Sequence, residues 1–228
     1  MPLITIRGQL GSGAPEIGRA VADRLRVDYV DQKIIAEVAT LLHRHEEEVI
    51  EKEMPPSSLL GRISEALDHG VAYGMVYLEG TYLPIWEIPL DDNGYLQALE
   101  SVVRELARSQ SLVIQGRGSQ FILREYPPAF HVQAVASLEV RVKRIMQDRQ
   151  LNPEIAKQEI ARFDNGSRRF VKRYFQAEVE DPLNYDLVIN TERLSFEAAA
   201  SIVVEALAVK DGTSGGQSRT DWVGRIGN

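Results

Sequence analysis

The chain has 228 residues, 44% of them hydrophobic, and a formal net charge of −7. This suits one globular domain with a substantial core, alone or with a sub-domain. The acidic balance argues against broad, non-specific nucleic-acid binding, because such binding needs an extended basic surface, so we expect no nucleic-acid partner. The chain has no cysteine, so disulfides and thiolate metal sites are excluded.

No apolar run reaches the roughly 18–20 residues that span a membrane, and Met1-Pro2 leads straight into a predicted strand without room for a signal peptide. We therefore expect a cytoplasmic protein with no membrane partner. His43 and His45 lie in an acidic stretch without a second ligand pair at metal-like spacing. We interpret both as solvated side chains and predict no metal site from them.

A glycine-rich loop follows the first predicted strand, residues 3–7, which is mostly apolar and β-branched. The loop opens a helix predicted from Glu16 to Leu25. Backbone N–H groups in such a loop, together with a helix N-terminus, can hold phosphate. A tight turn without a ligand is the alternative interpretation. The candidate phosphate-binding residues are Gly8, Gly11, Ser12, Gly13, Ala14, Pro15 and Glu16.

The loop carries glycines where the motif Gly-x4-Gly-Lys-Ser/Thr has them, but it lacks two side chains of that motif. Ala14 stands at the position of the lysine that reaches the β- and γ-phosphates, and Pro15 at that of the magnesium-binding hydroxyl. A dinucleotide-binding fingerprint fits less well, because Glu16 stands where its third glycine would be. The loop's shape predicts phosphate binding, whereas the missing side chains leave catalysis open.

The rest of the chain alternates between strands and helices. This alternation predicts an α/β fold, a parallel sheet with helices on both faces, in which ligands bind beyond the carboxyl ends of the strands. Asp31, Arg117 and Asn190 follow predicted strands. Together with the glycine loop they predict one crevice that holds backbone N–H groups, a carboxylate and an arginine. The predicted strands are 27–31, 112–114, 130–135 and 187–190, and the predicted helices are 33–42, 59–67, 95–109, 119–124, 137–150, 152–163 and 195–209.

Three stretches depart from this alternation. Residues 43–93 combine an acidic helix face, prolines and aromatic residues. We interpret them as an insertion that covers the site, with aromatics that pack rather than stack on bases. Residues 162–173 carry five positive charges and one negative, which indicates either phosphate contact or a solvated surface helix. Residues 210–228 are polar and rich in glycine and serine, and we expect them to be disordered.

Several short motifs, taken in their order and spacing, resemble the cytidylate kinase-like branch of the P-loop nucleoside monophosphate kinases. The resemblance implies a P-loop NTPase fold in one domain, 1–209, with a core of 1–42 and 94–209. It also implies a helical monophosphate-binding insertion at 43–93 and a lid at about 150–180. The motifs are the glycine loop, Tyr29-Val30-Asp31, Val113 to Gly118, Leu138 to Met146, Asp164 with Arg168-Arg169, and Asp181 to Thr191.

The resemblance implies transfer of the γ-phosphoryl group of ATP to a nucleoside monophosphate such as CMP. The glycine loop would hold the ATP phosphates. Asp31 would lie beside the acceptor nucleotide and Arg117 would clamp its phosphate. Arg144, Arg168 and Arg169 would stabilise charge near the transferred group. Magnesium is left open, because the loop lacks its hydroxyl.

Two further positions depart from cytidylate kinases, since Gln115 and Gly118 replace acidic residues of that family. A second hypothesis is therefore a catalytically inactive nucleotide-binding or regulatory protein. A third is an interaction protein that has kept only the fold, with the insertion as a partner or dimer surface. The sequence leaves a homo-oligomer open.

Overall fold

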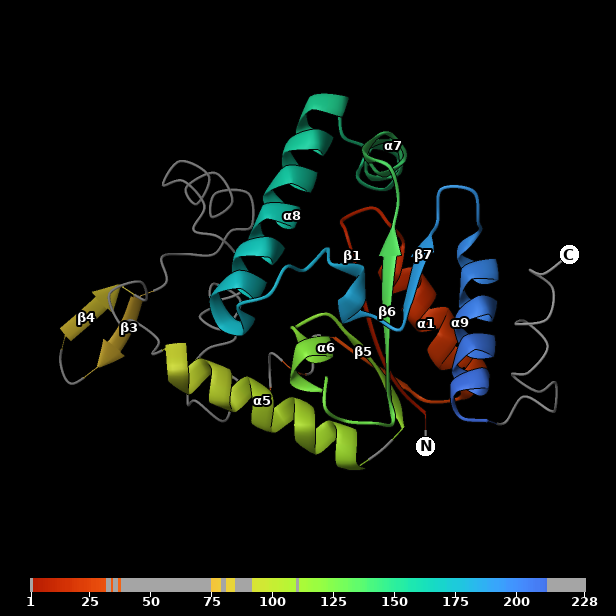
Figure 1. Ribbon diagram of the computed structural model, residues 1–228. Helices are drawn as coiled ribbons and strands as arrows, with labels where there is room; N and C mark the ends of the chain where they lie inside the picture. The colour runs from red at the N-terminus through yellow and green to blue at the C-terminus, as the bar shows by residue number, and fades with distance from the viewer. Residues whose placement is uncertain are drawn as a thin grey trace, which may run out of the picture.

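A five-stranded parallel sheet forms the centre of the computed structural model (Figure 1). The structure describes residues 2–31, 34, 37, 75–78, 81–84, 92–109 and 111–212. The strand order is β2-β5-β1-β6-β7. These strands are β1 (Leu3–Gly8), β2 (Asp28–Val30), β5 (Leu112–Gln115), β6 (Ala129–Val135) and β7 (Leu187–Asn190). The predicted α/β class with a parallel sheet is confirmed.

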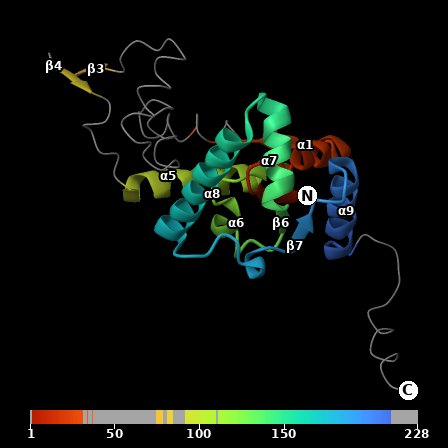
Figure 2. The same ribbon diagram turned by 90° about the horizontal axis from the view of Figure 1, so that it is seen from above.

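Helices cover both faces of this sheet. The helices α1 (Ala14–Leu25) and α9 (Phe196–Lys210) share one hydrophobic cluster with the sheet. The helices α5 (Asp92–Ser109), α6 (Ser119–Ile122) and part of α8 (Pro153–Phe175) pack on the opposite face. The helix α7 (Leu138–Arg149) lies at the carboxyl end of the sheet, beyond the arrowhead of β6, and α8 runs from beside α7 down towards α5 and α6 (Figure 1); the view from above shows α7 and α8 side by side (Figure 2).

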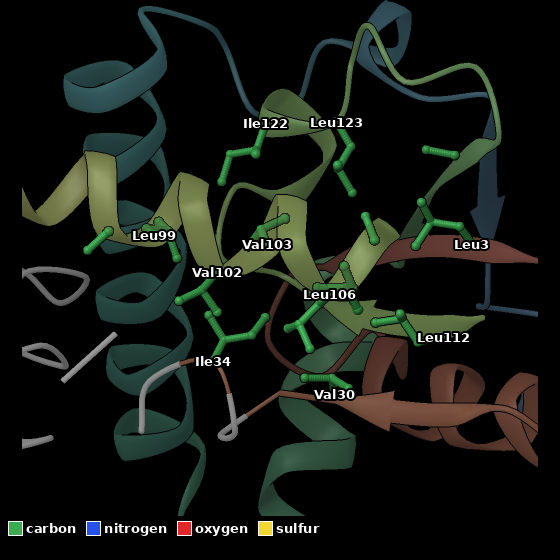
Figure 3. Packing of buried hydrophobic residues seen from close by; sticks show 14 of the residues in the cluster. Leu3, Val30, Ile34, Leu99, Val102, Val103, Leu106, Leu112, Ile122 and Leu123 are labelled. Atoms are coloured by element: carbon green, nitrogen blue, oxygen red, sulfur yellow. The ribbon is translucent and has the colours of Figure 1, made fainter. Parts of the chain in front are cut away.

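The alternation of side chains along β1 assigns each residue to a face. Ile4 and Ile6 are buried against α1 and α9, whereas Leu3 is buried in the cluster on the other side. That second cluster joins apolar residues of α5 and α6 to the strands (Figure 3). Arg7 falls on the same face as Leu3, because strand side chains repeat with a period of two.

Helix α8 runs unbroken for 23 residues, although the sequence predicted an end near residue 163. Asn152 caps its start, with Oδ1 accepting from the N–H of Ile155 at 2.9 Å. The segment Asp164-Asn165-Gly166 has the composition of a helix end, but Asp164 and Gly166 are buried inside the helix. Tertiary contacts of Asp164, given below, outweigh the local signal.

The remaining predicted strands and helices lie within a few residues of those observed, where they fall in the described part of the chain. The strands β3 (Met75–Leu78) and β4 (Thr81–Pro84) form an antiparallel pair within 43–93, where we predicted no strand. Of the helix predicted at 33–42, only Ile34 and Glu37 are described, and both are helical. The helix predicted at 59–67, both predicted solvated histidines and residues 213–228 lie outside the described residues. In the described part, no helix is long and apolar enough to span a membrane.

Candidate functional site

The predicted crevice lies at the carboxyl ends of β1, β2 and β5. The glycine loop follows β1, Asp31 follows β2, and Arg117 follows β5. Arg117 Nη2 donates to Asp31 Oδ1 at 3.3 Å, so side chains 86 residues apart in sequence meet. The carboxylate and the arginine that were expected in one crevice thus lie in contact at this edge. Asn190 ends β7, at the far edge of the sheet.

The glycine loop has the backbone that a phosphate-binding turn requires. Gly11 and Gly13 have φ of +82° and +87°, a conformation that costs other residues free energy. A Cβ on Gly13 would lie 2.1 Å from the Phe196 ring, and one on Gly11 would lie 3.0 Å from the Arg141 carbonyl oxygen. Both positions therefore require glycine, because the backbone is left-handed and because a side chain would clash with Phe196 or Arg141.

Three successive carbonyl groups of the loop accept hydrogen bonds from side chains of α7 and of the segment after β7. Arg141 donates to the carbonyl of Leu10 at 3.2 Å and Arg144 to that of Gly11 at 3.1 Å. Thr191 Oγ1 donates to the carbonyl of Ser12 at 2.7 Å. These contacts orient the peptide planes of the loop.

The N–H groups of those peptide units point the opposite way, because a trans peptide places N–H and C=O on opposite sides. The N–H of Ser12 closes a turn to Gln9 O at 3.0 Å. Within the described ranges, no acceptor binds the N–H groups of Gly11, Gly13 or Ala14. They lie at the start of α1, where the helix dipole is positive. The loop therefore offers several backbone donors to an anion.

Asp164 ties α8 to this loop. Its Oδ2 accepts from Arg141 Nη1 at 2.8 Å, and its Oδ1 accepts from the N–H of Leu10 at 3.2 Å. Asp164 is 4% exposed and Arg141 is 6% exposed. The sequence motifs contained both residues, but their role in holding the loop was not predicted.

The predicted charge-stabilising arginines lie in two different environments. Arg144 binds the loop and also donates to Thr191 O at 2.7 Å, with its guanidinium 4.9 Å from the Phe196 ring centre. Arg168 and Arg169 are exposed on α8, and Arg168 pairs with Glu180 at 2.8 Å. Their contribution at a transferred phosphoryl group stays a prediction.

Ala14 and Pro15, which replace the lysine and the hydroxyl residue of the P-loop motif, lie in the first turn of α1. Ala14 is 1% exposed and packs in the cluster with Ile17. Pro15 occupies an N1 or N2 position, where the lack of an N–H costs no helical bond. Glu16 is exposed.

Arg117 stands in a strained turn. Gly116, Arg117 and Gly118 have φ of +65°, +59° and +68°, a run of left-handed residues that is uncommon when it includes a non-glycine residue. Burial lowers the pKa of Arg117, and the Asp31 carboxylate opposes that shift. Burial raises the pKa of the neighbouring Tyr29 to about 12, with a further contribution from Asp31.

Six buried side-chain polar atoms have no hydrogen-bond partner within the described part of the chain. In the described part of the chain, each belongs to the last two residues of a strand or to the segment after it. Buried polar groups normally have partners, so this edge can bind a polar ligand. No three His, Cys, Asp or Glu side chains gather there as a metal group among the described residues. The atoms are Arg7 Nε, Ser12 Oγ, Tyr29 Oη, Gln115 Oε1, Ser119 Oγ and Gln120 Oε1.

The parallel sheet, the glycine loop at the start of α1 and the arginine beyond β5 together have the fold of the P-loop kinases. Residues 3–193 match the model of the cytidylate kinase-like family. The chain belongs to that family.

Similar proteins cover parts of this chain. Cytidylate kinase of Methanocaldococcus jannaschii is 26% identical over 105 residues, which is 45% of this chain and 59% of that kinase. Uronate isomerase of Corynebacterium glutamicum is 31% identical over 104 residues, 46% of this chain but 20% of that enzyme. The chain thus spans less than two thirds of these curated relatives.

A solved structure of an uncharacterized protein from Eubacterium ventriosum has a similar fold. The TM-score is 0.61 at 14% sequence identity, and the alignment covers 91% of this chain and 98% of that one. This likeness concerns the fold alone.

Proposed function

We propose that the protein is an ATP-dependent kinase that phosphorylates a nucleoside monophosphate, with CMP as the first candidate acceptor. The observation that carries this proposal is the loop whose carbonyls are bound by Arg141, Arg144 and Thr191. The N–H groups of Gly11, Gly13 and Ala14 in this loop can donate to a phosphate at the positive end of the α1 dipole. Membership of the cytidylate kinase-like family supports the same activity.

The acceptor would bind on the β2 and β5 side of the loop. Arg117 can make paired, charge-assisted bonds to a phosphate, and Asp31 beside it can accept from a base or ribose donor. An oxygen of the acceptor phosphate would bond to the γ-phosphorus of ATP. The bond from that phosphorus to the β,γ-bridging oxygen would break, and ADP would leave.

The chain's residues fit the phosphates of ATP better than they fit magnesium. The loop lacks the hydroxyl that binds the metal, because Pro15 stands there. Magnesium usually keeps several waters and binds through substrate phosphates, so no step here depends on a protein ligand for it. Positive charge at the transferred group would come from Arg168 and Arg169 of α8.

The test is a calorimetric titration with ATP and then with CMP, each with and without magnesium, followed by an assay of CMP-dependent ADP formation. We expect both ligands to bind and ADP to form. Arg117→Ala is expected to abolish turnover with the fold intact, whereas Arg124→Ala, an exposed arginine bound to Asn184, leaves it unchanged. A protein that turns over no nucleoside monophosphate is not this kinase.

A second candidate is a nucleotide-binding protein without catalysis. The buried Ala14 in place of the motif lysine favours it, because removing a positioned donor at a transition state costs about 3–4 kcal/mol. It predicts saturable ATP binding with little magnesium dependence and no ADP. The same two experiments therefore separate the candidates.

A further inference from the structure

A buried arginine without a carboxylate partner lies next to the glycine loop. Arg7, the residue before Gly8, is 6% exposed. Its Nη1 donates to Val179 O at 3.2 Å and its Nη2 to Ser167 Oγ at 3.1 Å. Nε has no partner. Across the ranges that the structure describes, no ion pair joins Arg7 to an acidic residue.

Arg141 shows how unusual this is. It is equally buried, yet the Asp164 carboxylate balances its charge at 2.8 Å. A buried cation that has only neutral acceptors carries a desolvation cost that its hydrogen bonds offset only in part. Arg7 is therefore a cation whose surroundings favour an added anion.

Two more donors converge with Arg7 on a single oxygen. Besides Arg7 Nη1, the carbonyl oxygen of Val179 accepts from Tyr185 Oη at 2.6 Å and from Gln133 Nε2 at 3.3 Å. A carbonyl oxygen has two lone pairs, so three donors exceed what it can accept well. The several oxygens of a phosphate or carboxylate suit such a set better.

This donor cluster lies where the sheet meets the predicted lid. Arg7 and Gln133 are paired residues on neighbouring strands β1 and β6, and Gln133 is 2% exposed. The two acceptors of Arg7 belong to the other side: Ser167 is in α8, and Val179 is in the segment that follows it. Displacement of the Val179 carbonyl would uncover Arg7 and Gln133 on the sheet and would release Tyr185 Oη, which belongs to the same segment as Val179.

We propose that Arg7, Gln133 and Tyr185 form an oxyanion-binding site, in which the Val179 carbonyl now lies where an oxygen of the ligand binds. The ligand is the phosphate or carboxylate group of a small molecule. That this ligand is the acceptor or the product of phosphoryl transfer rests on the proposed kinase function, whereas the binding of an oxyanion at this site does not. The alternative is a purely structural tie between β1 and α8.

The first measurement uses the full wild-type chain and inorganic phosphate, with malonate as the carboxylate arm. Hydrogen exchange of residues 176–186 is followed with and without each anion. The backbone N–H groups of Asp181, Asn184, Tyr185 and Asp186 are hydrogen-bonded in this segment. Phosphate or malonate that displaces Val179 speeds their exchange, and the more effective anion identifies the ligand group. Unchanged or slower exchange with both anions overturns the proposal.

The second measurement is calorimetric titration of the same anions into variants. Arg7→Gln keeps hydrogen-bond donors but removes the charge, and we expect about tenfold weaker binding or more. Arg124→Gln removes one charge near the same segment, outside the donor cluster, and keeps the wild-type affinity. Gln133→Leu and Tyr185→Phe retain Arg7 and report on the site if Arg7→Gln does not fold. Equal affinities in folded variants and wild type mean a structural tie only.

The outcome is independent of the kinase assay. Loss of anion binding in Arg7→Gln supports the site even if wild-type protein makes no ADP. If the wild-type protein forms ADP and Arg7→Gln binds the anions as wild type does, the oxyanion site is contradicted and the kinase proposal is not affected.

Discussion

Arg141 and Asp164 form an ion pair of 2.8 Å in which 7% and 5% of the two side chains are exposed. The pair joins α7 to α8 directly behind the glycine loop, and each partner also binds the backbone of Leu10. The conformation of the loop is therefore coupled to the position of α8. If the loop binds nucleotide as proposed, this coupling would connect nucleotide binding to the predicted lid by contacts within the core.

Asp164→Asn should reveal the strength of this coupling. Neutralising one partner leaves the Arg141 charge buried, and we expect a loss of about 3–5 kcal/mol in the free energy of unfolding. Urea unfolding measures it. Glu159→Gln is the matched control on the same helix, because its pair with Arg149 is exposed and should contribute at most about 1 kcal/mol. Equal losses in the two variants would contradict a buried anchor.

Gly13→Ala should destabilise the protein and weaken ATP binding. The φ of +87° is unfavourable for alanine, and the added Cβ meets the Phe196 ring, so we expect a loss above about 2 kcal/mol. Thermal unfolding and ATP titration measure both effects. Gly212→Ala, with φ of +68° and no neighbour within 4 Å, lacks the steric part and should cost only about 1–2 kcal/mol. Partial recovery in Gly13→Ala with Phe196→Ala would assign the steric part.

Thr191→Val should loosen the loop with almost no change in side-chain volume. The hydroxyl donates to Ser12 O and accepts from Arg144 at 2.9 Å, and its removal leaves buried groups unpaired. We expect a loss of about 1–3 kcal/mol and weaker ATP affinity, measured by urea unfolding and calorimetry. Ser201→Ala removes an exposed hydroxyl on α9 and should change neither value. A Thr191→Val protein with wild-type ATP affinity would show that the hydroxyl does not orient the loop.

His131 should make stability depend on pH. Its Nδ1 lies 2.8 Å from Thr5 Oγ1, and burial lowers its pKa, opposed by Asp186. The unfolded chain therefore binds a proton more readily than the native protein does, so stability falls as pH drops below about 6.5 towards the native pKa.

Urea unfolding at several pH values between 5 and 8 tests this. His131 should add at most about 1.4 kcal/mol per pH unit to the slope of the free energy of unfolding against pH. His131→Gln removes the titrating group and should lose that part of the slope. Identical slopes in the variant and the wild type would assign the pH dependence to other groups.

The edge of the sheet where the site lies could be predicted because it depends on local patterns. A parallel sheet places the segments after its strands together, so the proximity of Arg117 to Asp31 could be expected from the two strand ends, although their hydrogen bond was not predicted. The lack of lysine at Ala14 was also visible in the sequence. Local patterns likewise located most helices and strands to within a few residues.

Other features could not be predicted because they depend on contacts between distant segments. Thr191 and Ser12 are 179 residues apart, and no local pattern brings them together. The composition of Asp164-Asn165-Gly166 indicated a helix end, but the buried Asp164 keeps α8 continuous. No function was predicted for Arg7 from the sequence, because its neighbours Ser167, Val179 and Tyr185 come from the other end of the chain.

Asp164 is the twelfth of the 23 residues of α8, so the helix is fixed to the loop at its midpoint. The N-terminal half packs on α7 through Ala156 and Ile160. The C-terminal half ends at Phe175, whose ring fills the space beside Gly118. A rigid helix that turns about its centre moves both ends in opposite directions. If α8 closes over Arg117 as the proposed lid, its α7 end would therefore be displaced outward, and one rotation angle would describe both movements.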